Sequence, residues 1–175
     1  MCDNFFIITG GPGAGKTTLI EELRKRGFFC VEDIARKIIR DEAFGNNDRE
    51  NTQHFTEMLL SGSIEAYEKA MRDGYGTIFF DRGVVGDIGY VFRTNMLISP
   101  ELCRAASSLT YNKKVFMAPP WEEIYCNDNE RIQTYEKALE VYENLRDIHY
   151  KYGYEIVELP KTSVEKRADF VIGHI

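Results

Sequence analysis

The chain of 175 residues has the length of one domain, and its 43% hydrophobic content, with 10 Tyr and 11 Phe, excludes global disorder. Its net charge of −6 comes from interspersed acidic and basic residues, which argues against nucleic acid as a partner. No apolar run approaches the roughly 18 residues of a membrane span, and the four cysteines form no CxxC pair, so we expect a cytoplasmic protein without zinc or disulfides.

The first expected element is a strand over the apolar run Phe5 to Thr9, followed by the loop Gly10 to Thr17. This loop reads GGPGAGKT and fits the P-loop, or Walker A, pattern. Glycines let consecutive backbone N–H groups turn towards a phosphate with no Cβ in the way. The helix expected from Thr17 to Arg26 adds the positive end of its dipole.

The loop therefore predicts binding of a nucleoside triphosphate, ATP with Mg²⁺. Lys16 is expected to bridge the β- and γ-phosphates, and the Thr17 hydroxyl to ligate the metal. A glycine-rich turn that binds nothing is the alternative, but the strand before the loop and the helix after it meet the context that the motif requires. The residues expected to bind the nucleotide are Gly11, Pro12, Gly13, Ala14, Gly15, Lys16, Thr17 and Thr18.

A second strand is expected at Phe28 to Val31, where apolar residues alone predict burial on both faces, and a helix over 34–40 follows it. Glu32 and Asp33 stand between the two elements. Either acid is a candidate general base towards a substrate hydroxyl. Alternatively, an acid at this point stabilises the following helix through its dipole.

The remaining elements continue the alternation of helices and strands. The residues 52–73 have helical periodicity with a break at 61–63, which indicates a kink or two shorter helices. We expect Thr162 to cap the last helix, with Glu165 completing a capping box. Besides these features, the sequence predicts a turn at 45–48, strands at 77–80, 114–117 and 155–159, a short helix carrying Asp87 and Tyr90, a helix starting at Pro100, and a long amphipathic helix over 132–149.

Such an alternation predicts a single α/β domain over 1–175 with a mainly parallel sheet, whose ligands bind at the carboxyl ends of the strands. Asp81 ends the third strand and is a candidate Mg²⁺ ligand together with Thr17, or else a simple turn carboxylate. Arg82 is expected either to hold substrate phosphate or hydroxyls, or to form a structural ion pair. Arg131 follows a polar stretch from Glu122 to Glu130 and could stabilise transferring phosphate, or be a solvated cation at a helix start.

Several motifs occur in one order along the chain: GGPGAGKT, DIAR at 33–36, DRG at 81–83 followed by Asp87 and Tyr90, and PW at 120–121 leading to DNER at 128–131. Together they resemble the AAA-like family of predicted P-loop ATPases, which is similar to the nicotinamide riboside kinase domain of NAD-biosynthesis regulators and to nucleoside and nucleotide kinases. The resemblance covers nearly the whole chain. It departs from the family's pattern where Glu32 precedes Asp33 and where Asn129 replaces a usual glycine.

The resemblance implies a P-loop NTPase three-layer fold with a five-stranded parallel sheet in the order 2-3-1-4-5 and a mobile lid after strand four. It aligns Asp33 with the acid of an acid-x-alanine-arginine segment, and Arg131 with a lid arginine.

The leading interpretation is a kinase that transfers the γ-phosphoryl group of ATP·Mg²⁺ to a hydroxyl of a nucleoside-like or other small metabolite. In it, Arg36, Arg82 and Asp87 face the acceptor together with Asp33. The alternative is an ATPase or ATP-sensing module that acts through a protein partner. A GTPase-like switch is disfavoured, because residues 112–115 lack the final aspartate of the guanine-reading NKxD motif.

Overall fold

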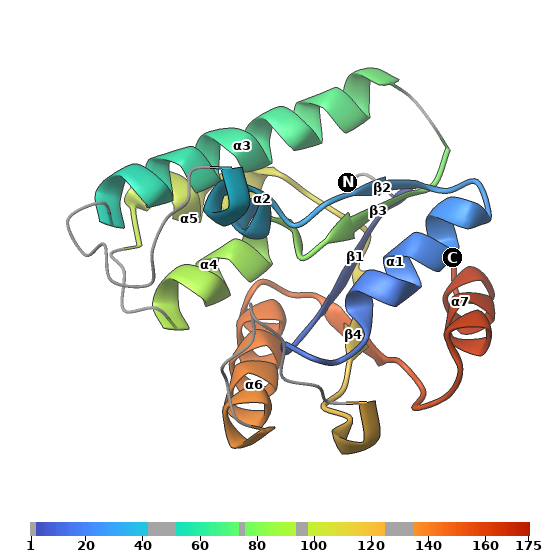
Figure 1. Ribbon diagram of the computed structural model, residues 1–175. Helices are drawn as coiled ribbons and strands as arrows, with labels where there is room; N and C mark the ends of the chain where they lie inside the picture. The colour runs from blue at the N-terminus through green and yellow to red at the C-terminus, as the bar shows by residue number, and fades with distance from the viewer. Residues whose placement is uncertain (1–2, 42–51, 74–75, 94–97, 125–134) are drawn as a thin grey trace.

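A computed structural model gives the fold and describes residues 3–41, 52–73, 76–93, 98–124 and 135–175 (Figure 1). Strands and helices alternate along the chain, as the sequence predicts. None of the helices in these ranges has the length and apolar character needed to cross a bilayer. The elements are β1 (Phe5–Gly10), α1 (Lys16–Lys25), β2 (Phe29–Val31), α2 (Ile34–Asp41), α3 (Thr52–Asp73), β3 (Ile78–Asp81), α4 (Gly83–Arg93), α5 (Pro100–Ser108), β4 (Lys114–Ala118), the short 3-10 helix η2 (Glu122–Ile124), α6 (Tyr135–Lys151), β5 (Glu155–Glu158) and α7 (Val164–Ile172).

The five strands form one parallel sheet in the order β2-β3-β1-β4-β5, which confirms the predicted P-loop topology. The central strand β1 lies between β3 and β4, so Ile7 pairs with Phe80 on one side and with Val115 on the other. The prediction that β2 is buried on both faces is wrong. Its residues are only partly buried, because β2 is an outer strand with a neighbour on one side alone.

Alternate residues of β1 point to opposite faces of the sheet, and each face is covered by helices. Phe6 and Ile8 pack with Leu19 of α1 and Val171 of α7. On the other face, Phe5 and Ile7 pack with the aromatic rings of Tyr67 and Tyr111. Figure 1 shows α1 and α7 side by side on one side of the sheet, and α3, α4 and α6 on the other. The result is the three-layer α/β architecture implied by the sequence.

The residues 61–63, where we expected a break, lie within the single helix α3. Each of the three residues has a local reason to be there. The hydroxyl of Ser61 donates to the carbonyl oxygen of Glu57 at 3.0 Å. A Cβ on Gly62 would lie 2.9 Å from Ile34 Cγ2, so the glycine permits close packing of α3 against α2. Ser63 is buried and faces α4.

Two helix starts differ in how well the sequence predicts them. At α5, Pro100 begins the helix as predicted, and the side chain of Ser99 accepts a hydrogen bond from the N–H of Leu102 at 3.1 Å. At α7, the N-cap is Ser163 and not the predicted Thr162. The reason is a turn in which the Thr162 N–H donates to the Pro160 carbonyl, so the helix begins one residue later.

Candidate active site

The loop between β1 and α1 forms at the carboxyl end of the central strand. Gly13 and Gly15 have φ values of 72° and 74°, in the left-handed region that a residue with a side chain adopts only with strain. The helix α1 begins at Lys16, immediately after the loop. Backbone N–H groups at such a helix start attract anions. The local structure is therefore that of the phosphate-binding loop predicted from the sequence.

The side chain of Lys16 folds back over this loop. Its Nζ donates to the carbonyl oxygens of Gly10 and Gly11 at 2.8 and 2.7 Å, and the residue is 7% exposed. Burial lowers the pKa of the Lys16 ammonium to about 8, although Asp81 opposes the shift. An anion bound in the loop would favour the charged form.

Asp33 and Arg82 form a buried ion pair beside the loop. Arg82 Nε and Nη2 donate to Asp33 Oδ2 at 3.1 and 2.9 Å. The other oxygen, Oδ1, accepts from the N–H of Arg36 at 3.1 Å, so Asp33 also stabilises the start of α2. Burial alone would raise the pKa of this carboxyl, but the charges and hydrogen bonds of Arg82 and Arg36 together outweigh it, and the pKa is lowered. Asp33 is therefore ionised and held in one orientation.

Arg36 joins this ion pair to the P-loop helix. Its Nη1 donates to Thr17 Oγ1 at 3.2 Å, while its backbone N–H bonds Asp33 as described above. A continuous chain of hydrogen bonds thus runs from Thr17 through Arg36 and Asp33 to Arg82. The candidate phosphate site and the candidate base are parts of one polar cluster.

Asp81 ends β3 next to Lys16. Its Oδ1 is buried and has no hydrogen-bond partner among the described residues, and burial raises the pKa of the carboxyl despite the nearby Lys16 charge. An unpartnered carboxylate oxygen beside a phosphate loop suits a hard cation such as Mg²⁺. Asp81 and the hydroxyl of Thr17 are the residues that would hold it.

Asp87 of α4 is buried and accepts a hydrogen bond from Ser63 Oγ at 2.7 Å. Burial raises the pKa of Asp87 to about 7. Asp81, Asp87 and Ser63 line one small cavity of about 10 Å³, next to the Asp33–Arg82 pair. The structure thus brings Asp87 into the same cluster as the other acceptor-side candidates.

A model of the AAA domain family matches residues 5–167. The chain belongs to this family. Over the residues that match, the AAA domain includes β1 with its loop, the Asp33–Arg82 pair and nearly half of α7. No curated protein matches the sequence significantly.

Solved structures similar to this AAA domain include a deoxyadenosine kinase, a thymidylate kinase and the NadR protein. Deoxyadenosine kinase from M. mycoides with bound dCTP superposes with a TM-score of 0.66 at 13% identity, over 97% of both chains. Thymidylate kinase from Ehrlichia chaffeensis gives a TM-score of 0.67 at 13% identity over 99% of both chains. The NadR protein in complex with NR gives 0.71 at 17% identity, over 98% of this chain and 50% of NadR. These likenesses show a common fold.

Glu32 lines the small cavity, but its carboxylate does not take part in the hydrogen bonds of the cluster. The carboxylate of Glu32 is 50% exposed and faces Arg40, whose Nη2 lies 3.7 Å from Glu32 Oε2. Of the two adjacent acids, the AAA domain therefore directs Asp33 and not Glu32 towards the P-loop. Arg131 and the polar stretch from 125 lie outside the described residues, as does the predicted turn at 45–48.

Two residues of the site were missed from the sequence. Ser63 was interpreted as part of a helix break, and Arg167 of α7 received no role. The guanidinium of Arg167 contacts the P-loop backbone, with Nη2 donating to the Ala14 carbonyl oxygen at 3.1 Å. Its one sequence signal was that the family resemblance covers nearly the whole chain.

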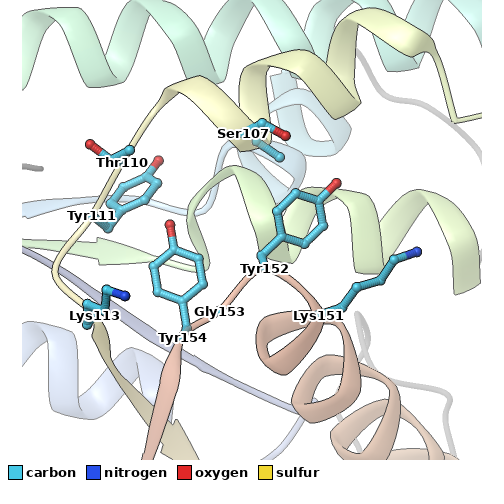
Figure 2. A pocket seen from close by; sticks show the side chains of 9 residues that line it. Ser107, Thr110, Tyr111, Lys113, Lys151, Tyr152, Gly153 and Tyr154 are labelled. Carbon is cyan, nitrogen blue, oxygen red and sulfur yellow. The ribbon is translucent and has the colours of Figure 1, made fainter.

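The AAA domain also carries an open pocket of about 660 Å³ at the opposite, amino-terminal end of the strands (Figure 2). It lies between the segment that leads into β4 and the turn from α6 to β5, from which Tyr152 and Tyr154 project side by side. Ligands of open parallel sheets bind at the carboxyl ends of the strands. This pocket is therefore separate from the candidate site.

Proposed function

We propose that this protein is a kinase that transfers the γ-phosphoryl group of ATP to a hydroxyl of a nucleoside-like small molecule. The observation that carries the proposal is the ionised, buried carboxylate of Asp33 next to a P-loop. A carboxylate fixed beside the phosphate site is suited to accept the proton of an alcohol that attacks the γ-phosphorus. The fold shared with deoxyadenosine and thymidylate kinases agrees with this choice.

On the donor side, the backbone N–H groups of Gly11 and of residues 13–18 would hold the phosphates of ATP. The Lys16 ammonium would leave the carbonyl oxygens of Gly10 and Gly11 and bind the β- and γ-phosphates. Asp81 and Thr17 would hold Mg²⁺, which neutralises charge on the phosphates when it is bound. The Asp81 carboxylate must be ionised for this role, and a cation next to it would lower its raised pKa.

On the acceptor side, Asp33 would take the proton as the acceptor oxygen bonds to the γ-phosphorus. The bond from that phosphorus to the bridging oxygen of ADP breaks in the same displacement. Arg82 would keep Asp33 ionised and oriented. Arg36, which lies between Asp33 and Thr17, would contact the acceptor. Asp87 would contact it too, since its carboxyl can donate or accept a hydrogen bond near neutral pH.

Arg131 completes the proposed site. If the protein is a kinase, an arginine placed after the polar segment that follows the fourth strand would reach the transferring phosphoryl group and stabilise its charge. Its role is inferred from sequence alone, because it lies outside the described residues.

The test is a screen of nucleosides, nucleotides and vitamins for ATP consumption by the purified protein, with the phosphorylated product identified by mass spectrometry. The Lys16→Ala variant should lose ATP binding or turnover severely while remaining folded, because the Lys16 charge acts on the ligand. ATP loss without a phosphorylated product, stimulated by a protein partner, would instead support the ATPase or ATP-sensing module. Unchanged ATP binding and turnover in Lys16→Ala would contradict both functions.

A further inference from the structure

Arg167 is a buried cation on the helix that packs beside the P-loop helix. It is 3% exposed, and α7 lies along α1 (Figure 1). Its guanidinium reaches back to two consecutive loop carbonyls: Nη2 donates to Ala14 O at 3.1 Å, and Nη1 lies 3.5 Å from Gly15 O. A Cβ on Gly15 would lie 2.7 Å from Arg167 Nη1, so the loop and the guanidinium are packed closely together.

The guanidinium has unusual electrostatic surroundings. Among the described residues, no carboxylate lies within ion-pair distance of Arg167, and its Nε has no hydrogen-bond partner. Burial lowers the pKa of the Arg167 side chain, with no acid to oppose the shift. A buried positive charge without a counterion is costly. An anion bound in the adjacent loop would provide the missing counter-charge.

The contact also fixes the direction of one backbone donor of the loop. In a trans peptide the C=O and the following N–H point in opposite directions. The Ala14 carbonyl accepts from Arg167 and is held on the α7 side, so the N–H of Gly15 points away from α7. The Gly15 carbonyl is held mainly within α1, where it accepts from Thr18 Oγ1 at 2.9 Å and from the Leu19 N–H at 3.3 Å. The Gly15 N–H is one of the donors expected to bind phosphate.

We propose that Arg167 is a positioning residue of the nucleotide site: it aims the Gly15 N–H group at the phosphates and adds a buried positive charge behind the loop. It does so without touching the nucleotide. This inference rests on the proposed nucleotide binding and extends it to the C-terminal helix. Arg167 should therefore set the affinity for polyphosphates much more than the affinity for an uncharged nucleoside.

Arg26 provides a matched control, because it links the same two helices without touching the loop. Its Nη1 lies 2.6 Å from Asp169 Oδ1, its Nη2 donates to the Glu165 carbonyl oxygen at 3.1 Å, and its Nε pairs with Glu22 at 2.9 Å. Replacing Arg26 by Met removes a cation between α1 and α7 that already has its counterions. Replacing Arg167 by Met removes one that has none.

The experiment measures equilibrium dissociation constants of ATP, ADP and adenosine for the parent, Arg167→Met and Arg26→Met, together with ligand-free thermal unfolding. We expect Arg167→Met to weaken ATP and ADP binding on the order of tenfold or more, as for lost hydrogen bonds of a charged group, with adenosine affinity unchanged. Arg26→Met should lower the melting temperature and leave all three constants within twofold of the parent. ATP affinity within twofold of the parent in Arg167→Met would overturn the inference.

A second pair of variants covers the case in which Arg167→Met does not fold. Arg167→Lys keeps the positive charge and Arg167→Gln does not, so the lysine variant should bind ATP at least threefold more tightly than the glutamine variant. Equal affinities would overturn the inference. A parent protein that binds no ATP overturns the proposed function as well, whereas a parent that binds ATP with unaffected Arg167 variants overturns this inference alone.

Discussion

Arg82 holds the carboxylate of Asp33 by two of its nitrogens, at 3.1 and 2.9 Å from the same oxygen, and does so from a strained backbone. Its φ of 90° is the only positive value among the described residues other than glycine. Strain of this kind persists where the surrounding structure requires it, often at functional sites. Here it turns the chain sharply after β3, so that the side chain of Arg82 points back towards α2.

The first prediction separates the two adjacent acids. Asp33→Asn should lower the rate of phosphoryl transfer 10²- to 10⁴-fold, as expected on the loss of a general base, while Glu32→Gln should retain nearly the parent rate. Single-turnover transfer to the acceptor found in the screen measures both rates. A larger loss in Glu32→Gln would assign the base to Glu32 and leave Asp33 as a helix cap.

The second prediction concerns the space that Arg82 needs. A Cβ on Gly86 would lie 2.2 Å from Arg82 Cγ, so Gly86→Ala should displace the arginine and break its pair with Asp33. We expect a loss of on the order of 1–3 kcal/mol in the free energy of unfolding, as for overpacking. In an Arg82→Ala background the same substitution should be neutral or stabilising, because alanine favours helix over glycine. Equal costs in the two backgrounds would show that the clash is not with Arg82.

The third prediction is a pH dependence of nucleotide affinity. Lys16 has a pKa of about 8 in the free protein, and bound phosphate would raise it, so binding above this pH takes up a proton. ATP affinity should therefore fall as pH rises from 8 to 10, by up to about tenfold per pH unit. Lys16→Arg stays charged throughout this range and should show a flatter profile in the same titrations. A parent profile as flat as that of Lys16→Arg would contradict the prediction.

The fourth prediction concerns stability. The pKa of Asp87 is about 7 in the folded protein and about 3.9 in an unfolded chain, so between these pH values the folded state holds more protons. The stabilisation that the proton on Asp87 gives the folded state is fully present below the unfolded pKa and is lost as pH rises through 7.

Asp87→Asn lacks this titration, so its free energy of unfolding relative to the parent should rise by on the order of 1 kcal/mol per pH unit between pH 5 and 7. Urea unfolding at several pH values measures the slope. Asp147→Asn, at a carboxylate that is 71% exposed, is the control. A relative stability of Asp87→Asn that stays constant over this range would refute the raised pKa.

The fifth prediction tests the metal site. Asp81→Asn should weaken ATP binding more in the presence of Mg²⁺ than in EDTA, because the lost carboxylate would be a ligand of the metal. Isothermal titration with and without Mg²⁺ gives the comparison. The same loss in both conditions would make Asp81 a structural residue.

The features that the sequence predicts well are local ones. The P-loop follows from a fixed spacing of glycines and Lys16, and the strands follow from short apolar runs. The choice between Glu32 and Asp33 could not be made, because both stand at the same strand end. Asp33 caps α2 and is buried, whereas Glu32 faces the exposed Arg40, and neither periodicity nor composition encodes that difference.

Contacts between distant segments were the ones missed. Ser63 bonds Asp87 across 24 residues, and Arg167 bonds Ala14 across 153. Such pairs leave no repeat in the sequence, and a Ser-Gly-Ser triplet within a helix resembles a break until its neighbours are known. The burial of β2 was overestimated for a related reason, since its outer position depends on how the other strands are ordered.

The central place of β1 has a consequence for biosynthesis. Of the five strands this one leaves the ribosome first, whereas its partners β3 and β4 end only at Asp81 and Ala118. The apolar run from Phe5 to Ile8 therefore has no partner strand until residue 81 has been made, and lacks its second partner until residue 118. Non-local pairing of this kind is slow and leaves nascent chains open to aggregation. A chain cut short before β4 would expose its central strand and could not shape the loop that follows it.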